Sequence, residues 1–169
     1  MSDSRELRAS PDSVGEDLQR AGHSPAGDAA ATPRDVAQRY LEGVAAFWAD
    51  PSAPQALASI LALFAEDVDW DIPGDLSVVP WIGPRRSREA VGDFFRQLAL
   101  HIEPQQFEAN RIVADDETVV VLGHLVSKVK RTGRLITSSF AFDFIVRNGR
   151  IARYRMFEDS HAVAQATRD

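Results

Sequence analysis

The segment from Tyr154 to Val163, YRMFEDSHAV, contains the residue best suited to chemistry, Asp159. A carboxylate that faces an apolar pocket has a raised pKa and can shuttle a proton near neutral pH. A carboxylate at the start of a helix instead accepts backbone N–H groups as a cap. Asp159 follows a strand-like run and precedes a short helix-like stretch, so both roles fit, and one does not exclude the other.

The residues next to Asp159 in the sequence are poorly placed to act as its catalytic partners. Glu158 is expected on the opposite face from Asp159, and His161 falls beyond the strand, so neither is a natural catalytic partner. In a regular strand, one face would carry Asp159 with Ile151, Arg153, Arg155 and Phe157, and the other Tyr154 and Met156. Neither face is cleanly apolar, so the alternation does not decide which face lines a cavity.

Two further polar residues are candidates. If Asp159 faces a cavity, Arg155 does so too, and it could pair with a carboxylate or bind a substrate oxygen. The alternative is a solvated arginine on the strand. His124 shares the parity of Lys128 and Lys130, which indicates an outward face. A β-bulge would reverse that parity, so His124 stays a secondary catalytic candidate.

Other kinds of site have little support. The four histidines are scattered without a metal-binding pair, and there are no cysteines. Asp67, Asp69, Asp71 and Asp75 lack the pattern of a calcium loop. We therefore expect no metal and no cofactor. A net charge of -6 argues against nucleic acid, and no apolar run reaches the roughly 18 residues of a membrane span. We expect no membrane association and a cytoplasmic protein.

Composition divides the chain into two parts. Residues 1–31 are rich in small and polar residues and predict a flexible tail. Residues 32–166 predict one domain. A helix begins at Thr32-Pro33, and apolar residues recur along it at three- and four-residue spacing. A second helix begins near Pro54 and leads into a short strand that stops at Pro73-Gly74, and Ser87 starts a third.

From Gln105 onward the apolar period changes to two. Four strands are predicted, at about residues 105–114, 117–131, 134–147 and 150–158. Asn148-Gly149 is a strong hairpin signal because both residues tolerate positive φ. Three helices followed by a meander of strands predict an α+β fold with a mostly antiparallel sheet.

The stretches LFAEDVDWDIPG, PWIGPRRSREAVGDFF and VRNGRIARYRMFEDSHAV, in this order, resemble the SnoaL-like branch of the nuclear transport factor 2-like superfamily. Ketosteroid isomerases, scytalone dehydratase and limonene epoxide hydrolase belong to the same superfamily. The resemblance covers roughly residues 33–165. It implies a strongly curved sheet wrapped around the helices as a cone, with a deep, mostly apolar pocket, and a homodimer formed through the sheet.

The resemblance also implies a function and a set of residues. Relatives bind hydrophobic small molecules, some with cofactor-independent acid/base chemistry of the isomerase, cyclase or dehydratase type, and an aspartate matching Asp159 faces their cavity. The expected pocket wall is apolar or aromatic throughout: Tyr40, Trp70, Trp81, Phe94, Phe140, Phe142 and Phe157.

The chain departs from its relatives at two places. Related cyclases often have a histidine near the position of Phe142, and the epoxide hydrolases need an arginine and an aspartate where Leu125 and Ser127 stand. Asp159 would therefore act nearly alone. A non-catalytic ligand-binding or dimerisation module of the same fold remains the alternative function.

Overall fold

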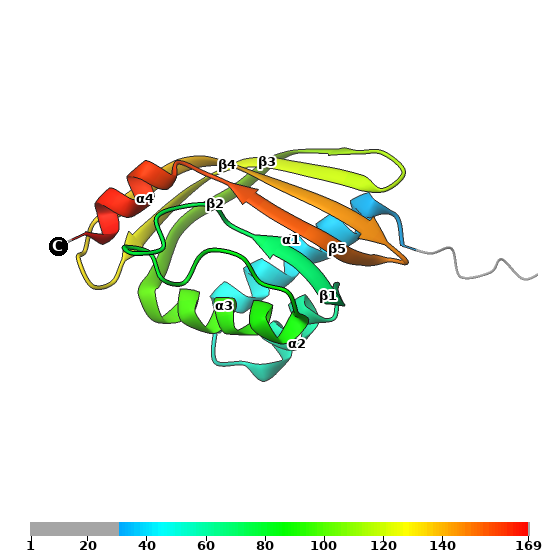
Figure 1. The fold of residues 1–169 in the computed structure, drawn as a ribbon, viewed down its shortest axis with the longest axis horizontal. Coiled ribbons are helices and arrows are strands. Elements are labelled where there is room, and N and C mark those ends of the chain that lie inside the picture. Colours follow the sequence, from blue (N-terminus) through cyan, green and yellow to red (C-terminus); the bar gives the residue numbers. More distant parts are fainter. Residues whose placement is uncertain (1–30, 169) are drawn as a thin grey trace, which may run out of the picture.

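A computed structural model describes residues 31–168. The tail predicted for residues 1–31 lies outside the described residues apart from Ala31. The described chain forms four helices and one five-stranded sheet, which confirms the α+β prediction (Figure 1). None of the described helices is long and apolar enough to cross a membrane.

Three helices lie on the concave side of the sheet: α1 (Pro33–Ala49), α2 (Pro54–Leu61) and α3 (Arg88–His101). Of these, α1 and α3 pack against the strands, and α2 packs on α1 and α3. The Thr32 hydroxyl accepts the Asp35 N–H at 3.2 Å, and the Asp35 carboxylate accepts the Thr32 N–H at 3.0 Å, which forms a capping box. The Ser87 hydroxyl caps α3 by accepting the Ala90 N–H. These caps start α1 and α3 at the residues that the sequence predicts.

The sheet has the strand order β1-β5-β4-β3-β2. β1 (Phe64–Asp71) runs parallel to β5 (Arg150–Phe157), and the pairs among β5, β4 (Leu135–Arg147), β3 (Thr118–Val129) and β2 (Ile102–Ala114) are antiparallel. β2 begins directly after α3, three residues earlier than predicted. It is an edge strand, where Pro104 is tolerated because the proline lacks only an outward-facing N–H.

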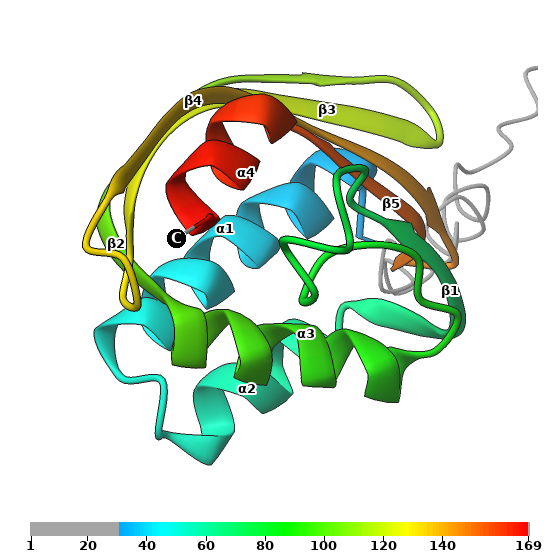
Figure 2. The same cartoon turned by 60° about the vertical axis from the view of Figure 1, so that its left-hand side comes forward.

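The sheet curls over α1 and encloses it from one side, with α2 and α3 on the other (Figure 2). Two irregularities in the β2–β3 register, at Pro104/Gln106 and Ala109/Arg111, allow this bend. Gly123 lies between them, and a Cβ atom there would overlap the Glu108 carbonyl oxygen and the Phe140 ring. A glycine is therefore required where β2 and β3 approach each other.

The fourth helix, α4 (Ser160–Thr167), follows β5 and packs against β4. Side chains of the β3–β4 hairpin hold its last carbonyls: Arg131 donates to Thr167, Thr132 to Ala166 at 2.7 Å, and Arg134 to Gln165 at 3.2 Å. Cationic donors at a helix C-terminus stabilise it. α4 thus anchors the segment that contains Glu158 and Asp159.

Candidate functional site

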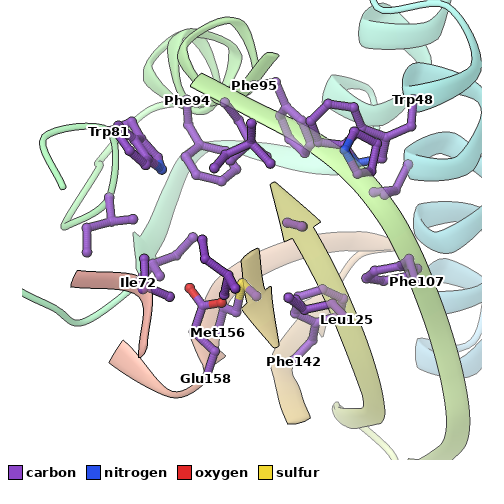
Figure 3. A pocket seen from close by; sticks show the side chains of 18 of the residues that line it. Trp48, Ile72, Trp81, Phe94, Phe95, Phe107, Leu125, Phe142, Met156 and Glu158 are labelled. Carbon is purple, nitrogen blue, oxygen red and sulfur yellow. The ribbon is translucent and has the colours of Figure 1, made fainter. Parts of the chain in front are cut away.

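A cavity of about 110 Å³ lies between the helices and the inner face of the sheet (Figure 3). On the helix and loop side, five aromatic residues line it: Tyr40, Trp48, Trp81, Phe94 and Phe95. Phe107, Phe142 and Tyr154 line it from the sheet. Apart from a few polar groups, the wall is therefore apolar and rich in ring surfaces.

Trp81 reaches this wall from the long loop between β1 and α3. The loop is tied back to β1 by two hydrogen bonds between the backbones of Trp70 and Arg85 and by one from the Gly83 N–H to the Ile72 carbonyl. Arg85 also donates to the Trp81 carbonyl at 2.7 Å. The loop thus has a fixed path, although the sequence predicts no regular structure in it.

A β-bulge decides which β5 residues face the cavity. Ile145 of β4 pairs with Arg153 and Val146 pairs with Ile151, so Ala152 is an extra residue on β5. Ile151 and Tyr154 are consequently both buried although they are three residues apart. Beyond the bulge the alternation is regular, and Tyr154, Met156 and Glu158 line the cavity. This bulge explains why neither face looked apolar in the sequence.

Glu158 extends its carboxyl group into the cavity beside Ile72 and Met156 (Figure 3). It makes no hydrogen bond or ion pair with any other residue in the described range 31–168. Burial, with a further contribution from the negative charge of Asp159, raises the pKa of Glu158 to about 7. Both its protonated and its ionised form are therefore accessible near neutral pH, as a proton donor or acceptor requires.

Asp159 is the N-cap of α4. Its carboxylate accepts the Ala162 N–H at 2.9 Å, and its own N–H donates to the Ser138 hydroxyl at 2.8 Å. The residue is exposed and does not line the cavity. Of the two roles open to Asp159 in the sequence, the structure shows the cap, because the residue that follows an inward-facing Glu158 on an extended backbone faces outward.

Arg155 and His124 lie on the outer face of the sheet. Arg155 donates to the Asp69 carboxylate at 2.7 Å and to the Asp69 carbonyl at 2.8 Å. His124 pairs in register with Ser139 and is half-buried. Neither residue lines the cavity, so the three predicted catalytic residues are not brought together there.

The predicted wall residues fall into two groups. Tyr40, Trp81, Phe94 and Phe142 line the cavity. Trp70 and Phe140 are buried behind its wall: Trp70 stacks on Tyr154 at 3.6 Å and Phe140 on Phe107 at 4.9 Å between ring centroids. Phe157 is 51% exposed on the opposite face of the sheet. It lies two residues after Arg155 on the strand, so its side chain points to the same outer face.

The cavity also contains polar groups that the sequence alone did not indicate. The Tyr40 and Tyr154 hydroxyls form a buried hydrogen bond of 3.1 Å, and burial raises the pKa of both. Both hydroxyls therefore stay protonated and can donate. The alternation of Tyr154, Met156 and Glu158 along the strand could have placed Tyr154 and Glu158 on the cavity side. That inference requires knowing that Tyr154 is buried. Within residues 31–168, no three acidic or histidine side chains lie close enough to hold a metal ion.

Solved structures share this fold. A nuclear transport factor 2-like protein from Burkholderia xenovorans is 29% identical, with a TM-score of 0.64 over 78% of this chain and 97% of that one. One from Burkholderia thailandensis is 22% identical, with a TM-score of 0.69 over 82% and 98%. A protein of ketosteroid isomerase-like fold from Catenulispora acidiphila, in complex with trimethylamine, is 13% identical, with a TM-score of 0.60 over 80% and 93%.

No curated protein matches the sequence. The model of the SnoaL-like domain matches residues 37–154, which is most of the chain, and this match ends before Glu158. The fold and the matched range agree with the resemblance seen in the sequence. The chain belongs to the SnoaL-like domain family, within the nuclear transport factor 2-like fold.

Proposed function

We propose that the protein binds a small lipophilic molecule in the cavity and that Glu158 exchanges a proton with it. The observation that carries this proposal is a carboxyl group inside an aromatic wall, with a pKa of about 7 and with no hydrogen-bonding or ionic partner among residues 31–168. The Tyr40–Tyr154 hydroxyl pair adds neutral donors. Glu158 takes the acid/base role that the sequence suggested for Asp159, and Asp159 orients it by capping α4.

The size of the cavity limits the bound group. An apolar cavity of roughly 150 Å³ holds benzene. The present cavity, at about 110 Å³, suits a single small ring or a branched alkyl group, and any remainder of a larger ligand would extend toward solvent. The trimethylamine complex of the Catenulispora protein is a small-molecule complex on the same fold.

Cyclohexanone in D₂O tests the proposal. The Glu158 carboxylate would take a proton from the carbon beside the carbonyl, exchange it with solvent and return deuterium, so the protein should accelerate deuterium incorporation measured by NMR. The rate should rise with pH through about 7, because the carboxylate is the base. Glu158→Gln should lower it about 100-fold or more, as removal of a general base does.

Two controls separate this chemistry from binding alone. Glu117→Gln removes an exposed carboxylate and should leave exchange unchanged. If cyclohexanone binds but neither the wild-type protein nor Glu158→Gln accelerates exchange, the non-catalytic ligand-binding function replaces the enzymatic one. If cyclohexanone shifts no indole signal of Trp48 or Trp81, which line the cavity, the ligand site itself is refuted.

We also propose that two copies pair through the outer face of the sheet. Leu122 of β3, Ala141 of β4 and Phe157 of β5 stand in register across three neighbouring strands, and Leu122 and Phe157 are 40% and 51% exposed. A continuous exposed apolar row is typical of an interface. Analytical ultracentrifugation should show a dimer that Phe157→Asp dissociates, and a monomeric wild-type protein would refute this.

A further inference from the structure

The charge of the cavity wall restricts the ligand more than its shape does. No lysine, arginine or histidine is among the described residues that line the cavity, and Glu158 is the one carboxylate among them. The remaining polar groups, Gln106, Ser127 and the tyrosine hydroxyls, are neutral. An anionic ligand would therefore enter an apolar space without a counter-charge and beside an acid, which is strongly unfavourable.

The aromatic rings add to this negative character. The face of an aromatic ring attracts cations within about 6 Å of its centroid. Because the cavity is small and aromatic residues line it from both sides, a cation bound inside lies close to several rings. Trp48 and Trp81 are the strongest such partners by residue type. Glu158 then supplies the formal negative charge, and the carboxylate of Asp159 stands next to it in the chain.

One cation already lies behind this wall. The Arg85 guanidinium is 5.3 Å from the centroid of the Phe94 ring. It does not line the cavity, and the carbonyls of Trp81 and Gly83 hold it. Arg85 is therefore not a counter-charge for an anion in the cavity.

The hydration of the ligand selects among cations. A primary ammonium is strongly hydrated, and the cavity offers few oxygen atoms to replace that water. A tertiary or quaternary alkylammonium is weakly hydrated, and its methyl groups fill apolar space. We infer that the ligand of this site carries a small tertiary or quaternary ammonium group, held among the aromatic side chains that line the cavity and paired with the Glu158 carboxylate.

This inference rests on the proposed ligand site but not on its proton exchange. Three probes of nearly equal shape test it: choline, its neutral isostere 3,3-dimethyl-1-butanol, and the anion 3,3-dimethylbutanoate. Binding is followed at pH 8 by the indole N–H signals of the full chain. The signals of Trp48 and Trp81 report on the cavity, and that of Trp70, behind the wall, is an internal control.

Choline should bind at least tenfold more tightly than the neutral isostere, and the anion should not bind. Glu158→Gln should remove most of the advantage that choline has over the isostere, and the aromatic rings should retain a smaller part of it. Trp81→Leu, which keeps an apolar side chain, should weaken choline more than the isostere.

Lowering the pH gives an independent readout, because the charge of choline does not change. Tyr154 and Asp159 are the titratable neighbours of Glu158, and His101 stacks on Trp81 at 4.5 Å. From pH 8 to pH 5.5, Glu158 gains a proton, so choline should lose most of its advantage. His101→Gln removes the imidazole that stacks on Trp81, and this variant should show the same loss of choline binding if Glu158 causes that loss.

The outcomes separate the two proposals. Isostere binding equal to or tighter than choline binding overturns the cation inference and leaves the ligand site standing. If none of the three probes binds, both the cation inference and the proposed ligand site fail. If choline keeps its full advantage in Glu158→Gln, the pairing with Glu158 is wrong.

Discussion

Within residues 31–168, acidic side chains form ion pairs with arginine on the outer face of the sheet, whereas the acid on the inner face does not. On the outer face, Asp143 accepts a hydrogen bond from Arg153 at 2.6 Å, and Asp69 accepts one from Arg155 at 2.7 Å. On the inner face, Glu158 has no such partner among the described residues. An arginine compensates the charge of each outer carboxylate, whereas the raised pKa of Glu158 lets it gain or lose a proton near neutral pH. The outer pairs therefore fix the strands, and the inner acid is available for chemistry.

The same contrast predicts a difference in how the two faces contribute to stability. Leaving an acid unpaired in an apolar cavity is unfavourable for the folded state whenever the acid is ionised. On the outer face, an arginine compensates the charge of each of these carboxylates through a hydrogen bond to one carboxylate oxygen, and the pairs are partly solvated. Four variants test this difference between the two faces.

The largest effect is expected for Glu158→Gln. The pKa of Glu158 is about 7 in the folded protein, against 4.5 for an ordinary glutamate in water. Its raised folded pKa gives a contribution to stability that is full below about pH 4.5 and is lost as pH rises through about 7. The variant should match the wild-type protein at pH 4 and exceed its free energy of unfolding at pH 8.5 by up to about 3 kcal/mol.

Urea unfolding from pH 4 to pH 8.5 measures this. Glu117→Gln, which removes an exposed acid, serves as the control and should show no such gain. Parallel stability curves for the wild-type protein and Glu158→Gln would mean that Glu158 is not an unpaired buried acid.

The next effect is expected on the outer face. Asp143→Asn removes the charge that pairs with the half-buried Arg153, and it should lower the free energy of unfolding by about 1–2 kcal/mol, as lost charged hydrogen bonds do. The pH-dependent difference attributed to Glu158 should stay intact. If Asp143→Asn also weakened the binding of a ligand in the cavity, the two faces of the sheet would not be independent.

Asp159→Ala removes the cap of α4. It should lower stability by about 1 kcal/mol, because the Ala162 N–H loses its acceptor. Thermal unfolding measures the loss. Ser52→Ala, which removes a hydroxyl from an exposed turn, provides a comparison at the surface. No loss of stability would mean that the cap contributes little to anchoring α4.

Asp159→Asn should have the smallest effect on stability, since asparagine caps a helix as well as aspartate does. It removes the negative charge that helps to raise the pKa of Glu158, so that pKa should fall. Carbon-13 NMR of the Glu158 carboxyl group follows the titration directly. An unchanged titration would assign the raised pKa to burial alone.

Local patterns were sufficient for most of the fold. The sequence predicts helices that begin at Thr32 and at Ser87, and both residues cap helices. It predicts a hairpin turn at Asn148-Gly149, and both residues have positive φ, at 51° and 70°. Such features depend on neighbours within a few residues, so the sequence specifies them directly. The start of β2 was predicted too late, because the edge position that tolerates Pro104 is a property of the whole sheet.

The arrangement of the cavity depends on contacts between segments that are distant in the sequence. The sequence alone determined that a short strand ends in Glu158-Asp159 before a helix, and that these two carboxylates point to opposite faces. Which face is enclosed was decided by tertiary structure: the bulge at Ala152 resets the alternation, and the loop that carries Trp81 closes the cavity over it. Both depend on pairing and packing between distant segments, and the pKa of Glu158 follows from that enclosure.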